Sequence, residues 1–304
     1  EDTDQKLTLE NFLDHYRLDP RSIYKFSSFS RLCARADVTE NFEEPIENVM
    51  TKALSRFACV DSRRWIAFML RILTNPGYPD FAKLTEIEKR MFYITMWGKA
   101  IEDWTADEVS ENIHALLNSP TMLSELIALL RYNYNRIDFI DEPVDLGFDC
   151  PLDLHCSYTR EQLLVAMDFM KPSIVREGVK WLPDKNIDVF FITLNKSDKD
   201  YSPTTMYQDY SINETLFHWQ SQSTTNAEGK VGQRYINHRK NGSKVLLFVR
   251  EFKNDIYGNT APYTYLGTAN YVSHNGSRPM NITWKLDDPI PAKYLKKTNK
   301  LVVG

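Results

Sequence analysis

Aromatic, acidic and amide side chains gather between residues 207 and 223 of this 304-residue sequence. Aromatic faces stack on nucleobases with about 1–3 kcal/mol per base. Carboxylates and amides can hydrogen-bond the Watson–Crick edge of a base that has left its helix. We therefore predict a modified-base pocket with an aromatic platform. Its candidate residues are Tyr207, Asp209, Tyr210, Phe217, His218, Trp219, Gln220 and Gln222.

A second set of side chains near this segment is suited to contacts with a DNA backbone, because its members carry positive charge or a phenolic hydroxyl. The candidates are Lys196, Lys199, Lys230, Arg234, Tyr235, Arg239 and Lys240. Residues 151–304 carry 20 Lys and Arg against 15 Asp and Glu, a net charge of +5, whereas residues 1–150 carry 17 against 26, a net of −9. This asymmetry suggests that only the second half faces a polyanion, although proteins that bind no nucleic acid also carry such a charge.

Alternation along residues 216–223 assigns these side chains to two faces of a predicted strand. Phe217 and Trp219 fall on one face together with two serines, whereas His218 and Gln220 fall on the other. In one interpretation, the aromatic residues hold a base. In the other, Phe217 and Trp219 fill a hydrophobic core and the amides form an exposed polar face. The pattern permits the base pocket without requiring it.

The first half of the chain is predicted to be helical. Residues 62–73 (SRRWIAFMLRIL) are apolar on nearly every side, which is typical of a central buried helix. Threonine followed three residues later by glutamate or glutamine marks helix starts at Thr85, Thr105 and Thr159. Pro120 suits the first turn of another helix. We see no catalytic constellation here and expect a helical scaffold over residues 1–150.

The hydrophobic period falls to two in the second half. Residues 188–194, 216–223, 244–251 and 280–286 are predicted strands. In the predicted strand over residues 263–272, alternation places one set of residues on a common face, namely Tyr263, Tyr265, Gly267, Ala269 and Tyr271. We predict an α+β protein in which an N-terminal all-helical domain (1–150) is followed by a small bent β-sheet or open barrel with a leading helix (151–304).

Several enzyme motifs are absent from the sequence, including the P-loop, His-Glu-x-x-His and Gly-x-Ser-x-Gly. The four cysteines lack a Cys-x-x-Cys pair, and the six histidines lack ligand spacing, so we predict no metal site. A nuclease site assembled around Asp209, His218 and His238 stays open as an alternative. No apolar run reaches the roughly 20 residues that span a bilayer, so we expect a cytoplasmic protein that does not contact a membrane.

Several linked stretches are similar to a family of bacterial proteins. They are LHCSYTREQLL (154–164), REGVKWLPDKNIDVFFITLNKSDKDYSPTTMYQDYSI (176–212), LFHWQSQSTT (216–225), GQRYINH (232–238), LLFVRE (246–251) and APYTYLGTANYVSHNGSRPMNITWKL (261–286). These stretches resemble the C-terminal domain of modification-dependent (type IV) restriction proteins, in which a phospholipase-D-like nuclease and a superfamily 2 helicase come first. Residues 7–36 resemble the coupling region before that domain.

The resemblance implies a target-recognition module with an SRA/PUA-like fold, which flips a modified base out of double-stranded DNA. The implied partners are DNA containing 5-methylcytosine or 5-hydroxymethylcytosine and the upstream helicase and nuclease domains of the same chain. The implied cofactors are ATP and a divalent metal in the parent protein and none in this fragment. The parent is also compatible with a homo-oligomer. The alternative is a structural or assembly domain of a helicase-nuclease that reads no base.

Overall fold

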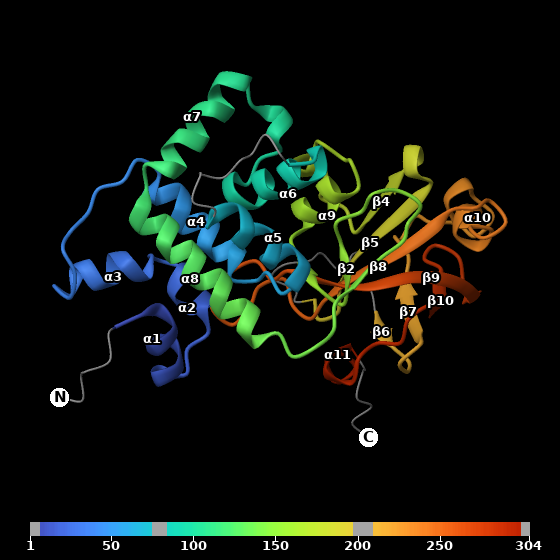
Figure 1. The fold of residues 1–304 in the computed structure, drawn as a ribbon. Helices are drawn as coiled ribbons and strands as arrows, with labels where there is room; N and C mark the ends of the chain where they lie inside the picture. Colours follow the sequence, from blue (N-terminus) through green and yellow to red (C-terminus); the bar gives the residue numbers. More distant parts are fainter. Residues whose placement is uncertain (1–6, 75–83, 197–208, 299–304) are drawn as a thin grey trace. The chain divides into compact units, whose positions relative to one another are not determined.

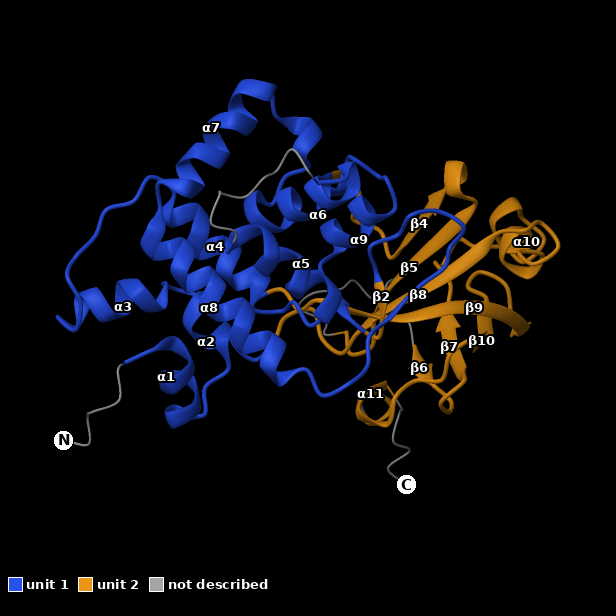
Figure 2. Cartoon of the chain, in the orientation of Figure 1, with its two compact units in different colours: residues 1–152, 156–173, 256–259 blue, residues 153–155, 174–255, 260–304 orange. Residues whose placement is uncertain are grey.

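The structure is a computed structural model that describes residues 7–74, 84–196 and 209–298 (Figure 1). Helices come first along the chain and a large mixed β-sheet follows, so the predicted α+β class is confirmed. The chain divides into two compact units, which are coloured separately in Figure 2. Unit 1 consists of residues 1–152, 156–173 and 256–259, and unit 2 of residues 153–155, 174–255 and 260–304.

Unit 1 is mainly helical. Its helices are α1 (Leu9–Tyr16), α2 (Pro20–Tyr24), α3 (Phe29–Arg35), α4 (Glu47–Phe57), α5 (Arg63–Leu73), α6 (Glu86–Trp97), α7 (Ala106–Leu117), α8 (Pro120–Arg136) and α9 (Arg160–Ala166), with short strands β1 (Glu142–Pro143) and β3 (Ser157–Tyr158). In the described part of the chain, no single helix is long and apolar enough to cross a membrane. Helices α7 and α8, bent by 83° at their junction, reach that length and composition only as a pair.

Local capping chemistry sets where these helices begin. The predicted capping boxes at Thr85, Thr105 and Thr159 are all present, at the starts of α6, α7 and α9. In each, the threonine hydroxyl accepts a backbone N–H while the side chain three residues on accepts the threonine N–H. The predicted central helix is α5, which buries Trp65 and most of its apolar side chains. The helix expected to lead the sheet is α9, and its residues cluster with unit 1.

Unit 2 is built around one open sheet. The strands of unit 2 are β2 (Asp153–Leu154), β4 (Val179–Leu182), β5 (Ile187–Thr193), β6 (Tyr210–Ser211), β7 (Leu216–Gln220), β8 (Lys244–Arg250), β9 (Tyr263–Asn275) and β10 (Asn281–Leu286), and its helices are α10 (Lys230–Ile236) and α11 (Ala292–Thr298). All of these strands except β2 belong to the open sheet. The strand order is β4-β5-β8-β9-β10-β7-β6. Strands β5 and β8 are parallel, and the other neighbours on this path are antiparallel. Because the path has two ends, the described sheet does not close into a barrel.

A bulge in β9 corrects the prediction that its tyrosines share one face. Leu247 of β8 pairs with Gly267, but the next residue of β8 pairs with Tyr265, so Leu266 is an extra residue. Tyr263 and Tyr265 therefore lie with Phe191 and Phe248 on one side of the sheet, whereas Leu266 and Ala269 join the core cluster on the other. Gly267 has a φ of +96°, a conformation that glycine adopts without strain.

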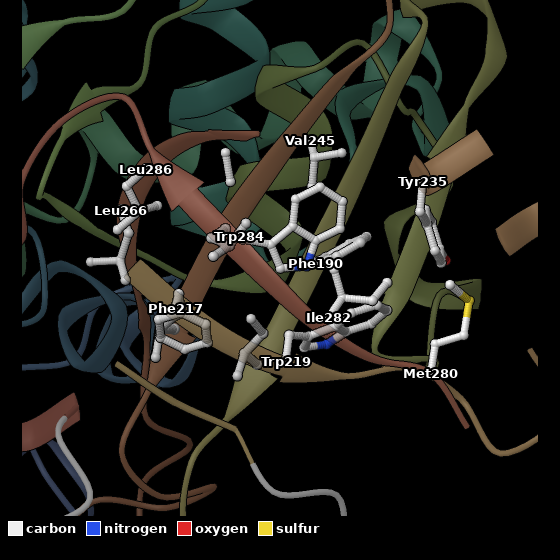
Figure 3. Packing of buried hydrophobic residues seen from close by; sticks show 14 of the residues in the cluster. Phe190, Phe217, Trp219, Tyr235, Val245, Leu266, Met280, Ile282, Trp284 and Leu286 are labelled. Atoms are coloured by element: carbon white, nitrogen blue, oxygen red, sulfur yellow. The ribbon is translucent and has the colours of Figure 1, made fainter. Parts of the chain in front are cut away.

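The core of unit 2 is an aromatic cluster between the sheet and α10 (Figure 3). The ring of Phe190 on β5 stacks on Trp219 of β7 at 4.1 Å between centroids and meets Trp284 of β10 edge-on at 5.6 Å. Tyr235 of α10 meets Phe190 and Trp219 edge-on at 5.4 and 5.6 Å. The packing of these rings holds α10 against one face of the sheet.

Candidate nucleic-acid interface

The face of β6, β7 and β10 that points away from this core is polar. We call it the polar sheet face; its polar residues are Tyr210, His218, Gln220, Asn281, Thr283 and Lys285, and Leu216 lies on it opposite Lys285. The Tyr210 and His218 rings lie nearly parallel, 14° apart with centroids at 4.7 Å, and both are partly exposed. One register step along β7, the Gln220 amide donates to Asn281 Oδ1 at 3.1 Å. Stacked rings beside an amide pair can hold the face and the edge of a base.

Asp209, the residue before β6, binds both β7 and a buried lysine. Its carboxylate accepts the backbone N–H of Gln220 at 2.9 Å and the Lys196 ammonium at 3.0 Å. Both side chains are buried, with 2% of Asp209 and 8% of Lys196 exposed. Burial raises the pKa of Asp209, and the neighbouring Lys196 charge opposes that rise. The pair therefore positions β6 against β7, and Lys196 is occupied by the carboxylate rather than presented to a phosphate.

Two aromatic residues of the predicted pocket lie on the opposite side of β7. Phe217 and Trp219 are 0% and 4% exposed and belong to the aromatic core, so neither ring offers a face to a ligand in this structure. The reason is cross-strand pairing: Phe217 lies opposite Trp284 and Trp219 opposite Ile282, which makes this the apolar face. Gln222 follows the strand and accepts the Thr225 hydroxyl at 3.2 Å. Tyr207 and Lys199 lie outside the described residues.

Three of the predicted phosphate contacts gather around α10 instead. A cleft of about 470 Å³ lies beside this helix, and we call it the α10 cleft. It is lined by Trp181, Lys230, Gln233, Arg234, Asn237, Lys240 and Asn241. Lys230 and Lys240 are exposed, and neither has a hydrogen bond or an ion pair within the described ranges. The cleft therefore combines an aromatic ring, neutral amides and positive charge.

A buried carboxylate fixes the wall of the α10 cleft. Asp188 on β5 is fully buried and accepts two hydrogen bonds from Arg234, at 2.7 Å from Nε and 2.8 Å from the terminal nitrogen. The guanidinium also lies over the Trp181 ring, 4.4 Å from its centroid. Burial raises the pKa of Asp188, and the bidentate contact with Arg234 favours the ionised carboxylate. This arrangement holds Arg234 and Trp181 in one geometry.

The prediction from sequence missed four residues of this cleft, which are Trp181, Gln233, Asn237 and Asn241. A signal for three of them was available. The polar residues at positions 230, 233, 234, 237 and 241 follow a helical spacing, which indicates one polar helix face. Trp181 carried no such signal, because only sheet pairing brings it opposite Asp188. Two further predicted contacts point elsewhere: Tyr235 is fully buried in the core, and Arg239 donates to Asn270 at 2.8 Å.

One of the two histidines of the alternative nuclease site, His238, has both ring nitrogens in contact with backbone groups. His238 is buried, its Nδ1 contacts the Ser243 carbonyl oxygen at 3.1 Å, and its Nε2 accepts the Tyr271 N–H at 3.0 Å. Burial lowers its pKa, which favours the neutral ring with the proton on Nδ1. Across residues 7–74, 84–196 and 209–298, no three His, Cys, Asp or Glu side chains are grouped to hold a metal ion. The described residues thus give His238 a role in joining α10 to β9.

A protein-family model matches the second half of the chain. Residues 152–297, which include all the described strands of the main sheet path and α10, match the family described as "Domain of unknown function (DUF3427)". No curated protein matches the chain. The match therefore relates unit 2 to a domain family and names no activity for it.

Proposed function

We propose that unit 2 is the target-recognition part of an ATP-dependent type IV restriction enzyme and binds DNA containing 5-methylcytosine or 5-hydroxymethylcytosine. The observation that carries this proposal is the Tyr210–His218 stack beside the Gln220–Asn281 amide pair on a partly exposed sheet face. The base, flipped out of the duplex, stacks on these rings. Gln220 contacts its polar edge.

The proposal places base readout on the polar sheet face rather than on Phe217 and Trp219. A ring pair that is already stacked loses little freedom when a base is added, and stacking is worth about 1–3 kcal/mol per base. A methyl group adds about 0.8 kcal/mol when buried, or roughly fourfold in affinity. Stronger selectivity requires the site to close differently around the modified base.

The wider assignment is supported by the resemblance of stretches within residues 7–36 and 154–286 to the C-terminal part of type IV restriction proteins and by the DUF3427 match over residues 152–297. In this proposal, the acidic helical unit 1 couples recognition to a helicase and a nuclease elsewhere in the parent. ATP and a divalent metal belong to those domains. The positive charge of residues 151–304 supplies the attraction to DNA.

The test is fluorescence anisotropy with two duplexes that differ only in one 5-methylcytosine, at low and moderate salt. We expect tighter binding to the methylated duplex at both salt concentrations. His218→Ala should weaken that binding by about 1–3 kcal/mol. His114→Ala is the matched control, because His114 is exposed on α7 of unit 1. Equal affinity for both duplexes would contradict base readout, and equal loss in the control would contradict a role for the polar sheet face.

The burial of Trp219 and Phe217 favours the second candidate function, a structural or assembly domain that reads no base. In that case the aromatic residues only form the core, and unit 2 holds together the helicase lobes or the copies of a homo-oligomer. Analytical ultracentrifugation of the parent with and without unit 2 distinguishes this function, because loss of assembly with unchanged DNA selectivity would favour it.

A further inference from the structure

We propose that the α10 cleft is a second binding site that takes one nucleotide with an unpaired base. This site is separate from the polar sheet face. Trp181 pairs with Asp188, and Asp188 shares its strand face with Phe190, whose ring stacks on Trp219. The α10 cleft thus lies on the core side of the sheet, whereas His218 lies on the other side. The proposal therefore stands independently of base readout by His218.

The cleft carries anion-attracting charge that no group among the described residues neutralises. Lys230 precedes Gln233 and Arg234 on α10, and Lys240 follows the helix. Within the described ranges both lysines lack an ion-pair partner, whereas Arg234 is neutralised by the buried Asp188. Two free ammonium groups beside one cleft favour a ligand with a phosphate group.

The cleft also offers hydrogen-bonding groups that a base edge can use. Asn237 donates to the carbonyl and side-chain oxygens of Gln233, at 3.1 and 3.0 Å, which orients its amide. Its Oδ1 has no hydrogen-bond partner among the described residues, and neither has the side-chain amide of Asn241. These groups present one oriented acceptor and one amide without a partner among the described residues, in the cleft that Trp181 also lines.

The size of the cleft selects a nucleotide over a duplex. Its volume of about 470 Å³ lies within the range of about 300–1,000 Å³ that is usual for small-molecule sites. In a duplex the Watson–Crick edges are already paired, so Asn237 and Asn241 could reach only the groove edges of the bases. A free mononucleotide and a nucleotide within an unpaired strand share the required chemistry, namely a phosphate and an open base edge.

The test uses the whole chain and isothermal titration calorimetry with deoxycytidine 5′-monophosphate, inorganic phosphate and a four-nucleotide single strand. We expect the mononucleotide to bind more tightly than phosphate. Asn237→Ala should weaken mononucleotide binding by about three- to tenfold, the worth of one hydrogen bond, and leave phosphate binding unchanged. Lys240→Ala should weaken both and reduce the salt dependence of strand binding by about 0.7 in the log–log slope.

Lys52→Ala is the matched control, because Lys52 is exposed on α4 of unit 1 and lines neither the cleft nor the polar sheet face. Tighter binding of the strand than of the mononucleotide would identify an unpaired strand as the source, and equal binding a free nucleotide; both support the site. Equal affinity for phosphate and mononucleotide, or no effect of Asn237→Ala, would overturn the proposal. The selectivity for methylated duplex DNA is measured separately with the Asn237→Ala variant. A negative result for one of the two sites therefore does not affect the test of the other.

Discussion

Replacing Trp219 by alanine tests whether this side chain forms core or contacts ligand. The ring is 4% exposed, stacks on Phe190 at 4.1 Å and meets Tyr235 edge-on at 5.6 Å. Removing a buried tryptophan costs about 3–5 kcal/mol. Two ring contacts of about 0.5–1.5 kcal/mol each form part of that loss. We therefore expect Trp219→Ala to lower the free energy of unfolding of unit 2 by about 4 kcal/mol.

The assay is urea unfolding of the whole chain, followed by circular dichroism and by hydrogen exchange of the amides in β5, β7 and β10. With an m-value of about 2 kcal/mol per molar urea, the midpoint should fall by about 2 M. Hydrogen exchange is needed because two units can unfold separately. Trp219→Phe is the matched control, since phenylalanine keeps the stack on Phe190. This variant should lose less than half of the stability that Trp219→Ala loses. An alanine variant of normal stability that has lost methyl selectivity would refute the core assignment.

Three further predictions concern buried polar groups and close packing in unit 2. Lys196→Met should cost about 3–5 kcal/mol near neutral pH, because it leaves the buried Asp209 carboxylate without its partner. Since burial already raises the pKa of Asp209, the loss should shrink as acid protonates the carboxyl group. The lowered pKa of His238 means that the unfolded state binds protons more readily. Stability should therefore fall as pH drops below about 6.5, by up to about 1.4 kcal/mol per pH unit. Gly232→Ala should destabilise α10, although alanine is normally the better helix former, because its Cβ would overlap the Asn226 carbonyl oxygen.

Each of these predictions has its own check by thermal or urea unfolding. The double variant Lys196→Met with Asp209→Asn should recover most of the lost stability, and failure to recover would mean that the lysine matters for packing. His238→Gln should remove part of the pH dependence; part should remain, because burial also lowers the pKa of His155. A Gly232→Ala variant as stable as the original chain would contradict the close approach of α10 to Asn226.

Local signals were sufficient for much of the fold. The capping box at Thr105 predicts the start of α7 correctly, because both of its hydrogen bonds lie within one turn of helix. The alternation along β10 puts Ile282 and Trp284 on one face and Thr283 and Lys285 on the other, and the structure buries the first pair. These features depend on residues a few positions apart, so the sequence contains all of the information. The bulge at Leu266 has no such signal, since it depends on the partner strand.

The sequence by itself determined the two faces of β7 and the residues on each; only the tertiary structure decided which face is the core. Trp219 is buried because β5 and β10 bring Phe190 and Ile282 to its side of the sheet, and so His218 is left on the polar face. The tertiary structure also decided which residues form the α10 cleft. Trp181 and Arg234 are distant in sequence and meet because both contact the buried Asp188 on β5. Strand pairing between distant segments is selected by the burial of the whole apolar surface, and no short stretch of sequence contains that information.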